Sequence, residues 1–335
     1  MAAKYAKDQP EGFTNAIERV AIIGAGGQMG SHFTRALLAT GKHRITAVTR
    51  PNSNSAIPAG VNVIKADYTD HAALVSAFKG QQFLIITLAV FAPADTHANL
   101  VKAAGEAGVP YIMPNWYGGD PQNVEMWKAV HLPNSADGYR AQIEQAGAKH
   151  IFLACSFWYE FSLGGGPDRY GFDFHKKSLV LFDEGEVRIN TTTWPQCGRA
   201  VAALLSLKEL PEDEHDRTTT LSQFANGTIY TSSFKINQKE MFESVKRVTG
   251  TQDEDWTITK EPSGPRYEGA VADMMKGNMS GFARQLYTRA FFPGSAGEYE
   301  SVRGLANDVL GLPKEDLDEA TKEAVRMAEN NEVPY

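Results

Sequence analysis

The stretch that decides the fold of this chain is Val20-Ala-Ile-Ile-Gly-Ala-Gly-Gly-Gln-Met-Gly30. Its first four residues are apolar, as in a strand buried on both faces of a sheet. Glycines then recur at every third position, and residues 31–40 predict a helix that ends at Gly41. Glycines between a buried strand and a helix N-terminus let backbone N–H groups approach an anion, and the helix end adds partial positive charge. The stretch therefore predicts a phosphate cradle, with a βα turn that holds no ligand as the alternative.

Length and charge limit the classes of protein to consider. The chain has 335 residues, 42% of them hydrophobic, and a formal net charge of −7. This length suits one large α/β domain or two intimately joined ones. The mildly acidic balance includes no basic stripe, so we expect no nucleic-acid partner. No apolar run approaches the ~20 residues of a membrane span, and the N-terminus lacks the apolar core of a signal peptide.

Cysteine usage indicates the compartment. Cys155 and Cys197 are the only cysteines, too few for a disulfide framework, which fits a reducing environment. No group of His, Cys and Asp residues has metal-ligand spacing, so we expect no metal site. The expected protein is cytoplasmic, a monomer or a homodimer, that binds a small-molecule substrate.

Strand and helix patterns alternate through the first half of the chain. After the first unit, strands are predicted at 44–50, 61–68, 83–89, 111–114 and 150–155, and helices at 71–78, 97–107 and 136–145. Repeated βα units of ~25 to 30 residues require parallel strands with right-handed crossovers. We therefore predict an α/β fold: a Rossmann-type, doubly wound parallel sheet with a smaller, intimately packed α+β C-terminal part.

The end of the second strand indicates which dinucleotide binds. A free ribose 2′-OH usually meets Asp or Glu ~20 residues beyond the glycines, whereas a 2′-phosphate is met by Arg. Here Arg50 ends the strand, with hydroxyl and amide side chains such as Asn52 behind it. This favours NADP(H) over NAD, with a solvated strand-end charge as the alternative. Asp67, at the end of the third strand, can accept from the adenine amino group.

Ligands of such sheets lie beyond the carboxyl ends of the strands. The residues expected to bind the cofactor there are Gly24, Gly26, Gly27, Gln28, Met29, Gly30, Arg50, Asn52, Asp67, Tyr68, Leu88, Ala89, Pro114, Asn115, Ser156 and Phe157. Within this set Gly24, Gly27 and Gly30 form the glycine triplet, and Gly26 is an additional glycine.

The C-terminal half is less regular. Residues 156–166 combine aromatic residues with a triple glycine, which favours a pocket wall with a mobile edge over plain core. The other predictions are a hairpin at 178–182 and 186–190, strands at 227–232 and 256–260, and helices at 197–207, 238–249, 268–287 and 314–329. The loop at 211–216 reads as solvated acidic surface. The predicted organisation is a loose N-terminal arm at 1–17, an NADP-binding Rossmann domain at 18–160, and a substrate-binding part at 161–335, which leaves room for helix 197–207 to pack back on the Rossmann sheet.

These residues together resemble the NmrA-like, isoflavone-reductase-like branch of the atypical short-chain dehydrogenases. The matching features are the GAGGQMG loop, Arg50, the Ala66-Asp-Tyr-Thr-Asp70 segment, and residues 115–121, which take the place of the family's P-S-E-F-G-x-D-P motif. The aromatic segments at 157–161 and 193–195 look like those of fungal secondary-metabolism members. The resemblance implies NADPH across the carboxyl edge of the sheet, and small, often aromatic substrates held between the two parts.

One position departs from the family pattern. Isoflavone-reductase-type enzymes carry a catalytic lysine on the helix before the sixth strand, but Ala136 or Gly138 stands there in this chain. No Tyr-x-x-x-Lys pair replaces it. The candidate proton donors near the expected mouth are Tyr139, Tyr117, Tyr159, His131 and Lys128. The expected substrate-pocket residues are Trp116, Tyr117, Trp158 and Tyr159.

Two functions from different classes fit these residues. The first is an NADPH-dependent reductase of a carbonyl or conjugated double bond in a small aromatic natural product. The second is a non-catalytic NADP(H)-sensing regulator of the NmrA type. The lysine departure favours the sensor, and the aromatic, glycine-edged wall favours the enzyme. An apolar cavity that opens onto the nicotinamide would support the enzyme.

Overall fold

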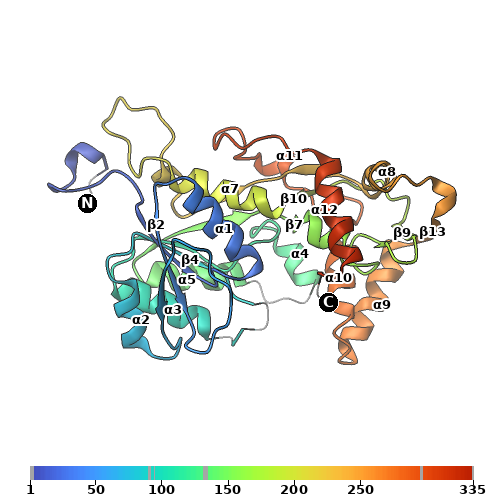
Figure 1. The fold of residues 1–335 in the computed structure, drawn as a ribbon, viewed down its shortest axis with the longest axis horizontal. Helices are drawn as coiled ribbons and strands as arrows, with labels where there is room; N and C mark the ends of the chain where they lie inside the picture. The colour runs from blue at the N-terminus through green and yellow to red at the C-terminus, as the bar shows by residue number, and fades with distance from the viewer. Residues whose placement is uncertain (1–3, 90–91, 94, 131–134, 295–296, 334–335) are drawn as a thin grey trace.

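The centre of the molecule is a seven-stranded sheet with the order β11-β6-β5-β4-β1-β2-β3, in which every pairing is parallel (Figure 1). The computed structural model describes residues 4–89, 92–93, 95–130, 135–294 and 297–333. The strands are β1 (Arg19–Ile23), β2 (Arg44–Thr49), β3 (Asn62–Lys65), β4 (Phe83–Ile86), β5 (Tyr111–Met113), β6 (Lys149–Ala154) and β11 (Gly227–Tyr230). The chain leaves β3 and crosses β1 to form β4, so the strand order reverses between β1 and β4. The predicted Rossmann-type doubly wound sheet is confirmed.

Helices cover both faces of this sheet, as Figure 1 shows. One face packs on α1 (Gln28–Ala39) and α7 (Trp194–Leu205), and the other on α2 (His71–Phe78), α3 (Thr96–Glu106) and α5 (Ser135–Gln145). Alternate residues of β1 serve the two faces: Val20 and Ile22 join the first core, and Ala21 and Ile23 join the second. This double burial explains why the strand sequence is continuously apolar.

Two elements of the C-terminal half complete this layer. The strand predicted at 227–232 is β11, and it pairs with β6 as the seventh strand, a pairing that the sequence pattern did not indicate. Helix α7 packs closely on α1, because a Cβ at Gly198 would lie 2.7 Å from the backbone oxygen of His32. This helix begins at Trp194, three residues before the predicted start, since the side chain of Thr193 caps it by accepting from the Gln196 N–H.

Two small sheets and four longer helices form the rest of the C-terminal half. Their strand orders are β12-β10-β7 and β13-β9-β8. The strands are β7 (Phe157–Trp158), β8 (Phe172–Asp173), β9 (Ser178–Phe182), β10 (Ile189–Thr192), β12 (Phe234–Ile236) and β13 (Thr257–Glu261). The helices, with two short ones among them, are α6 (Tyr159–Leu163), α8 (Gln238–Thr249), α9 (Ser263–Met275), α10 (Gly281–Ala290), α11 (Glu300–Arg303) and α12 (Leu317–Glu329). The short helix α4 (Val124–Ala129) comes earlier in the chain but packs in the same core.

The predicted hairpin at 178–190 is wrong. Strand β9 pairs with β8 and β13, whereas β10 pairs with β7 and β12. The turn residue Asp183 has a φ of 52° and donates its N–H to the Glu261 carbonyl oxygen, while its carboxylate accepts from the Ser263 N–H at the start of α9. These long-range bonds direct the chain toward β13 instead of back along β9.

The single helix predicted at 268–287 is two helices, α9 and α10. The chain turns between them at Gly277, whose φ of +79° is suited to glycine. A Cβ at Gly281 would lie 2.5 Å from the Ala270 carbonyl oxygen. Glycine there lets α10 fold back tightly against α9, where the helical period alone predicts one continuous helix.

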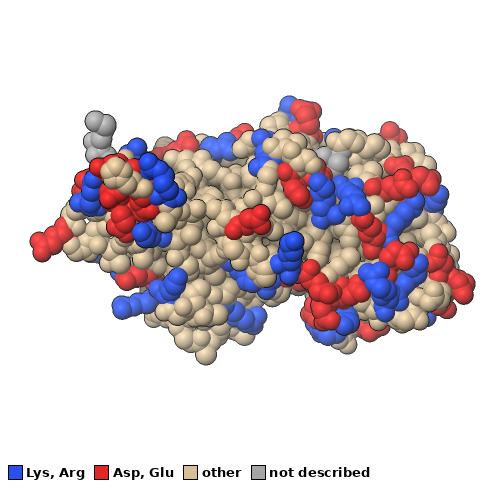
Figure 2. Space-filling view, turned by 90° about the horizontal axis from the view of Figure 1, so that it is seen from above, with Lys and Arg blue, Asp and Glu red and all other residues tan. Residues whose placement is uncertain are grey.

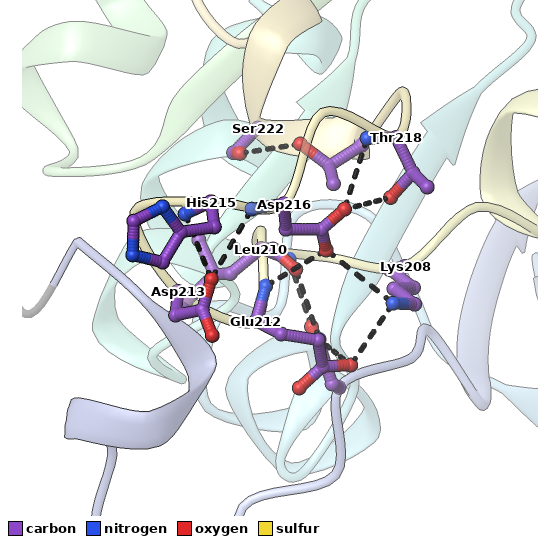
Figure 3. Close-up of polar contacts among 10 residues, drawn as sticks. Lys208, Leu210, Glu212, Asp213, His215, Asp216, Thr218 and Ser222 are labelled. Atoms are coloured by element: carbon purple, nitrogen blue, oxygen red, sulfur yellow. Dashed lines mark hydrogen bonds and ion pairs between the residues drawn. The ribbon is translucent and has the colours of Figure 1, made fainter.

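The N-terminal arm is bound to the acidic loop that follows α7, rather than loose. Asn15 donates to the Leu210 carbonyl oxygen at 2.9 Å, and the Ala6 N–H donates to that of Pro211. Within the loop the carboxylate of Asp216 accepts from the Glu212 N–H, from Thr218 and from Lys208 (Figure 3). These donors hold the pKa of Asp216 well below its usual range. The loop is an internally bonded cap, not simply solvated chain.

Candidate functional site

The glycine turn after β1 has one open face. Gly24 has a φ of +77°, and a Cβ there would lie 2.2 Å from the Thr87 carbonyl oxygen. At Gly30 a Cβ would lie 2.1 Å from the carbonyl oxygen of Gly24. At Gly27, by contrast, that same oxygen is the one close atom, at 3.2 Å, and the residue is exposed. Packing alone thus demands the first and third glycines. Gly27 is exposed at the N-cap of α1, and its own N–H donates to the Gly24 carbonyl oxygen at 2.8 Å, so a phosphate would be held by the N–H groups of the helix N-terminus that follows.

Gly26 has a structural role of its own. A Cβ there would lie 2.7 Å from the Ala56 carbonyl oxygen and 3.0 Å from the side chain of Ser55. The loop that follows β2 therefore crosses directly against the glycine turn. Gly26 permits this crossing and is more than an accessory to the triplet.

Arg50 begins that loop. Its side chain is exposed and forms no ion pair within the described part of the chain. Tyr68 lies near enough to Arg50 for the guanidinium charge to act on its hydroxyl. Burial raises the pKa of Tyr68 to about 12, and the charge of Arg50 partly opposes this rise. The Tyr68 hydroxyl donates to the Val48 carbonyl oxygen at 3.0 Å. Asp67 is exposed at the end of β3, and its carboxylate accepts from the Thr69 N–H and hydroxyl. The residues predicted for the adenosine end thus lie at one corner of the sheet, with Asn52 exposed beside them.

The edge beyond β4 and β5 is braced by Asn115. Its Oδ1 accepts from the Leu88 N–H at 2.9 Å, and its Nδ2 donates to the Leu88 carbonyl oxygen at 3.3 Å. Thr87 donates to the Ile23 carbonyl oxygen at 2.7 Å, which ties the end of β4 to β1. These bonds hold the predicted cofactor segments at 88–89 and 114–115 in register beside the glycine turn. Thr87 was missed by sequence reasoning, since no motif contains it.

The segment beyond β6 leads away from this edge. Ser156 is buried with a φ of 55°, and its N–H donates to the Gly118 carbonyl oxygen at 2.8 Å. The ring of Phe157 stacks on Tyr287 of α10 at a centroid distance of 4.1 Å, so Phe157 belongs to the C-terminal core. Trp158 is half-buried and packs with Phe161. Of these two aromatic residues, Trp158 fits the expected pocket wall better.

Several predicted catalytic residues do not lie at the mouth. Tyr159 is fully buried, and its hydroxyl shares a 2.8 Å hydrogen bond with Thr321 of α12. Lys128 is exposed and pairs with Glu125 at 3.4 Å. The indole N–H of Trp116 donates to the Gly119 carbonyl oxygen, and its ring meets Trp127 edge-on. His131 lies outside the described residues.

Tyr117 and Tyr139 remain at the carboxyl edge. The Tyr117 hydroxyl donates to the Ile86 carbonyl oxygen at 2.9 Å, and burial raises its pKa well above the ordinary value. Tyr139 is half-buried on the first turns of α5, beside the family's lysine position, where Ala136 is buried and Gly138 is exposed. Its ring stacks on that of His97. Of the two tyrosines, Tyr139 is the one on the helix turn that carries the lysine in isoflavone-reductase-type enzymes, and its role as proton donor stays a prediction.

Sequence reasoning also missed a buried carboxyl group beside Trp158. Glu160 is 3% exposed, and its Oε2 accepts from the Trp194 N–H at 3.2 Å, at the N-terminus of α7. Burial raises the pKa of Glu160 to about 7, and the charges of Glu315 and Glu323 add to the effect. A carboxyl group with this pKa is half protonated near neutral pH, which no local pattern indicated.

Asp120 joins the two halves of the molecule. Its carboxylate accepts from the Tyr230 hydroxyl at 2.8 Å and from Arg303 of α11 at 2.9 Å. A cavity of about 360 Å³ lies here, lined by Asp120, Arg303 and neighbouring polar residues. A second cavity of about 240 Å³ lies between residues 164–175 and the end of the chain. Neither of these two cavities is lined by the glycine turn or by Tyr139, so they do not supply the apolar cavity expected over the nicotinamide.

Three further observations on the described residues concern metal sites, membrane spans and surface charge. They contain no group of three His, Cys, Asp or Glu side chains arranged to hold a metal ion. Among the same residues, no helix is both long and apolar enough to cross a membrane. On the face that Figure 2 draws, basic and acidic side chains intermingle without a broad basic area.

Comparisons with known proteins agree with this fold. Residues 17–164 match the NmrA-like family. Oxidoreductase aprR of Aspergillus flavus is 25% identical, over 90% of this chain and 96% of its own length. Crystal structures of pinoresinol-lariciresinol and phenylcoumaran benzylic ether reductases include one that superposes with a TM-score of 0.72, at 19% identity, over 92% of this chain and 99% of that chain. The NADPH complex of quinone oxidoreductase QOR2 from Escherichia coli superposes with a TM-score of 0.63, at 20% identity, over 90% and 98% of the two chains.

The agreement extends from the glycine turn to the C-terminal helices. The family match covers β1 to α6, and the solved structures share the fold beyond it. The resemblance predicted from the sequence is thus confirmed: residues 17–164 match the NmrA-like family, the chain shares its fold with solved reductases, and homologues of it are named oxidoreductases.

Proposed function

We propose that this chain is an NADPH-dependent reductase of a carbonyl or conjugated double bond in a small aromatic natural product, acting in the cytoplasm. The observation that carries the proposal is the exposed face of Gly27 at the N-cap of α1, between two glycines that packing already requires. A Cβ at Gly24 or Gly30 would overlap a backbone oxygen at 2.2 or 2.1 Å, whereas a Cβ at position 27 would have one close neighbour, at 3.2 Å, and would otherwise stand on the face where a phosphate would bind. The full-length relative named an oxidoreductase and the superposed NADPH complex support the same activity.

The residues of the turn and of the β2 loop fit an NADP dinucleotide. The backbone N–H groups around Gly27 and the N-terminus of α1 would hold the pyrophosphate. The exposed guanidinium of Arg50 would hold the 2′-phosphate, for which its planar fork is well shaped. When bound, NADPH supplies the hydride.

Tyr139 would supply the proton. Reduction of a carbonyl or an enone places negative charge on an oxygen, which an acid within hydrogen-bond reach neutralises. Tyr139 lies on the turn of α5 where the family's lysine stands, and it is half-buried rather than enclosed in the core. Tyr117 is the second choice, since burial raises the pKa of its hydroxyl well above the ordinary value.

The second candidate function is a non-catalytic NADP(H) sensor. Ala136 and Gly138 at the lysine position favour it, because neither side chain can donate a proton. The sensor and the enzyme share the cofactor site, so cofactor binding alone does not separate them. Turnover does.

The test is a screen of NADPH consumption, followed at 340 nm, against a panel of aromatic ketones and enones. We expect steady oxidation of NADPH with at least one compound, and a slower rate with NADH. The matched control is Gly27→Val, which blocks the open face of the turn and should give no oxidation. Tight binding of NADPH without consumption across the whole panel would instead favour the sensor, and failure to bind NADPH would contradict both.

A further inference from the structure

His97 lies where the first turns of α3 and α5 meet, and nothing so far assigns it a role. It is the second residue of α3, and its side chain is only 3% exposed. Its ring stacks on that of Tyr139, with centroids 3.7 Å apart and planes inclined by 24°. Helices that connect parallel strands run antiparallel to them, so both helices begin at the carboxyl edge of the sheet. The His97–Tyr139 contact therefore lies at the edge where ligands of this fold bind.

The hydrogen bond at one ring nitrogen sets the tautomer of His97. Its Nδ1 lies 2.8 Å from Oε1 of Gln142, one helical turn along α5 from Tyr139. An amide oxygen can only accept, so Nδ1 carries the hydrogen. Burial lowers the pKa of His97 to about 4, which keeps the imidazole neutral at physiological pH. A neutral imidazole protonated at Nδ1 has a bare lone pair at Nε2.

Among the described residues, that lone pair has no hydrogen-bond partner. Nε2 of His97 is buried, and no group in the described part of the chain donates a hydrogen bond to it. Buried polar atoms in native proteins are nearly always paired, and exceptions call for an explanation such as a ligand that completes them. His150 also has an unpartnered ring nitrogen, but it is the second residue of β6, at the opposite, amino edge of the sheet.

We propose that His97 is a ligand-binding residue of the reductase site, whose Nε2 accepts a hydrogen bond from a hydroxyl group of the bound molecule. The inference rests on the proposed function, because it needs a ligand at this edge. An acceptor nitrogen selects a donor and rejects a carbonyl oxygen. Two sources offer a hydroxyl donor here: the ribose of the nicotinamide half of NADPH, and a phenol or alcohol on the substrate.

The experiment compares three variants by calorimetric titration with NADPH and by KM for the substrate found in the screen. His97→Phe keeps a flat ring to stack on Tyr139 but lacks both nitrogens. His97→Gln places an amide acceptor near the position of Nε2. His150→Phe is the matched control, since it removes an equally buried histidine with an unpartnered nitrogen at the other edge. The melting temperature of each variant reports whether it folds.

We expect His97→Phe to lose about tenfold in affinity, equivalent to about 1.4 kcal/mol, and His97→Gln to stay within about threefold of the wild type. A loss in NADPH affinity identifies the ribose hydroxyl, and a rise in substrate KM alone identifies a substrate hydroxyl. His150→Phe should change neither. The inference is overturned if His97→Phe binds and turns over like the wild type, or if His97→Gln is no better than His97→Phe.

A measurement on the unaltered protein covers the case in which His97→Phe does not fold. The ¹⁵N resonances of the His97 ring should show a protonated Nδ1 and a bare Nε2 that shifts when NADPH or substrate is added. An Nε2 resonance that responds to neither molecule overturns the inference and leaves the proposed function standing. If the wild-type chain does not bind NADPH at all, the proposed function fails and this inference fails with it.

Discussion

The buried carboxyl group of Glu160 predicts an unusual dependence of stability on pH. Its folded-state pKa of about 7 lies above the ordinary 4.5, because burial disfavours the charge. Between these two values the folded chain binds more protons at this site than the unfolded chain does. The free energy of unfolding therefore falls as pH rises through that window, and the contribution of the neutral carboxyl is lost above pH 7. The full effect is about 3 kcal/mol, from about 1.4 kcal/mol for each pKa unit.

Glu160→Gln removes the titration and keeps an oxygen that can accept from the Trp194 N–H. We expect the variant to gain stability relative to the wild type as pH rises, by about 2 to 3 kcal/mol between pH 5 and pH 8. The assay is urea unfolding followed by circular dichroism at several pH values, with both proteins in the same buffers. Glu268→Gln, which removes an exposed carboxylate on α9, is the control for the loss of one negative charge. A stability difference between Glu160→Gln and wild type that stays constant with pH would refute the reasoning.

Three further predictions concern the cofactor site and the proton donor. Arg50→Ala should weaken NADPH at least tenfold more than NADH in calorimetric titrations; equal losses would remove its phosphate role. Gly27→Val should abolish dinucleotide binding with little change in melting temperature. Gly30→Ala, by contrast, should unfold or strongly destabilise the chain, since its Cβ would meet a backbone oxygen at 2.1 Å. A Gly27→Val protein that still binds NADPH would contradict the proposed phosphate site at this turn. Tyr139→Phe should slow turnover at least tenfold, a barrier increase of about 1.4 kcal/mol, and near-normal kcat would exclude it as the acid.

Local sequence signals predicted the doubly wound sheet and its first βα unit well. The strand, glycine turn and helix of the first βα unit are specified by neighbouring residues, so their pattern is readable without the fold. The positions of Arg50 and Asn115 follow in the same way, because each comes directly after a buried strand and the ends of parallel strands meet at one edge.

The roles of individual side chains at the site could not be predicted from the same patterns. The residues around Tyr159 and Tyr139 in the sequence do not distinguish the two tyrosines. In the fold, Tyr159 forms a hydrogen bond with Thr321 in the core, whereas Tyr139 is half-buried on α5. His97 is 42 residues from Tyr139, and the buried state of Glu160 depends on α7 and α12. These properties arise from contacts between distant segments, which no window of the sequence contains.

The sequence by itself therefore determined the doubly wound sheet and the glycine turn, because alternation of apolar runs, glycines and helix ends is a local property. Only the tertiary structure decided that β11 and α7 complete the layer built on the main sheet, that β9 pairs with β13 instead of β10, and that Tyr159 is buried whereas Tyr139 is half-buried. The physical reason is that strand pairing and burial depend on which segments meet when the chain collapses. A single Cβ or hydrogen bond from a segment distant in sequence can then favour one pairing over another.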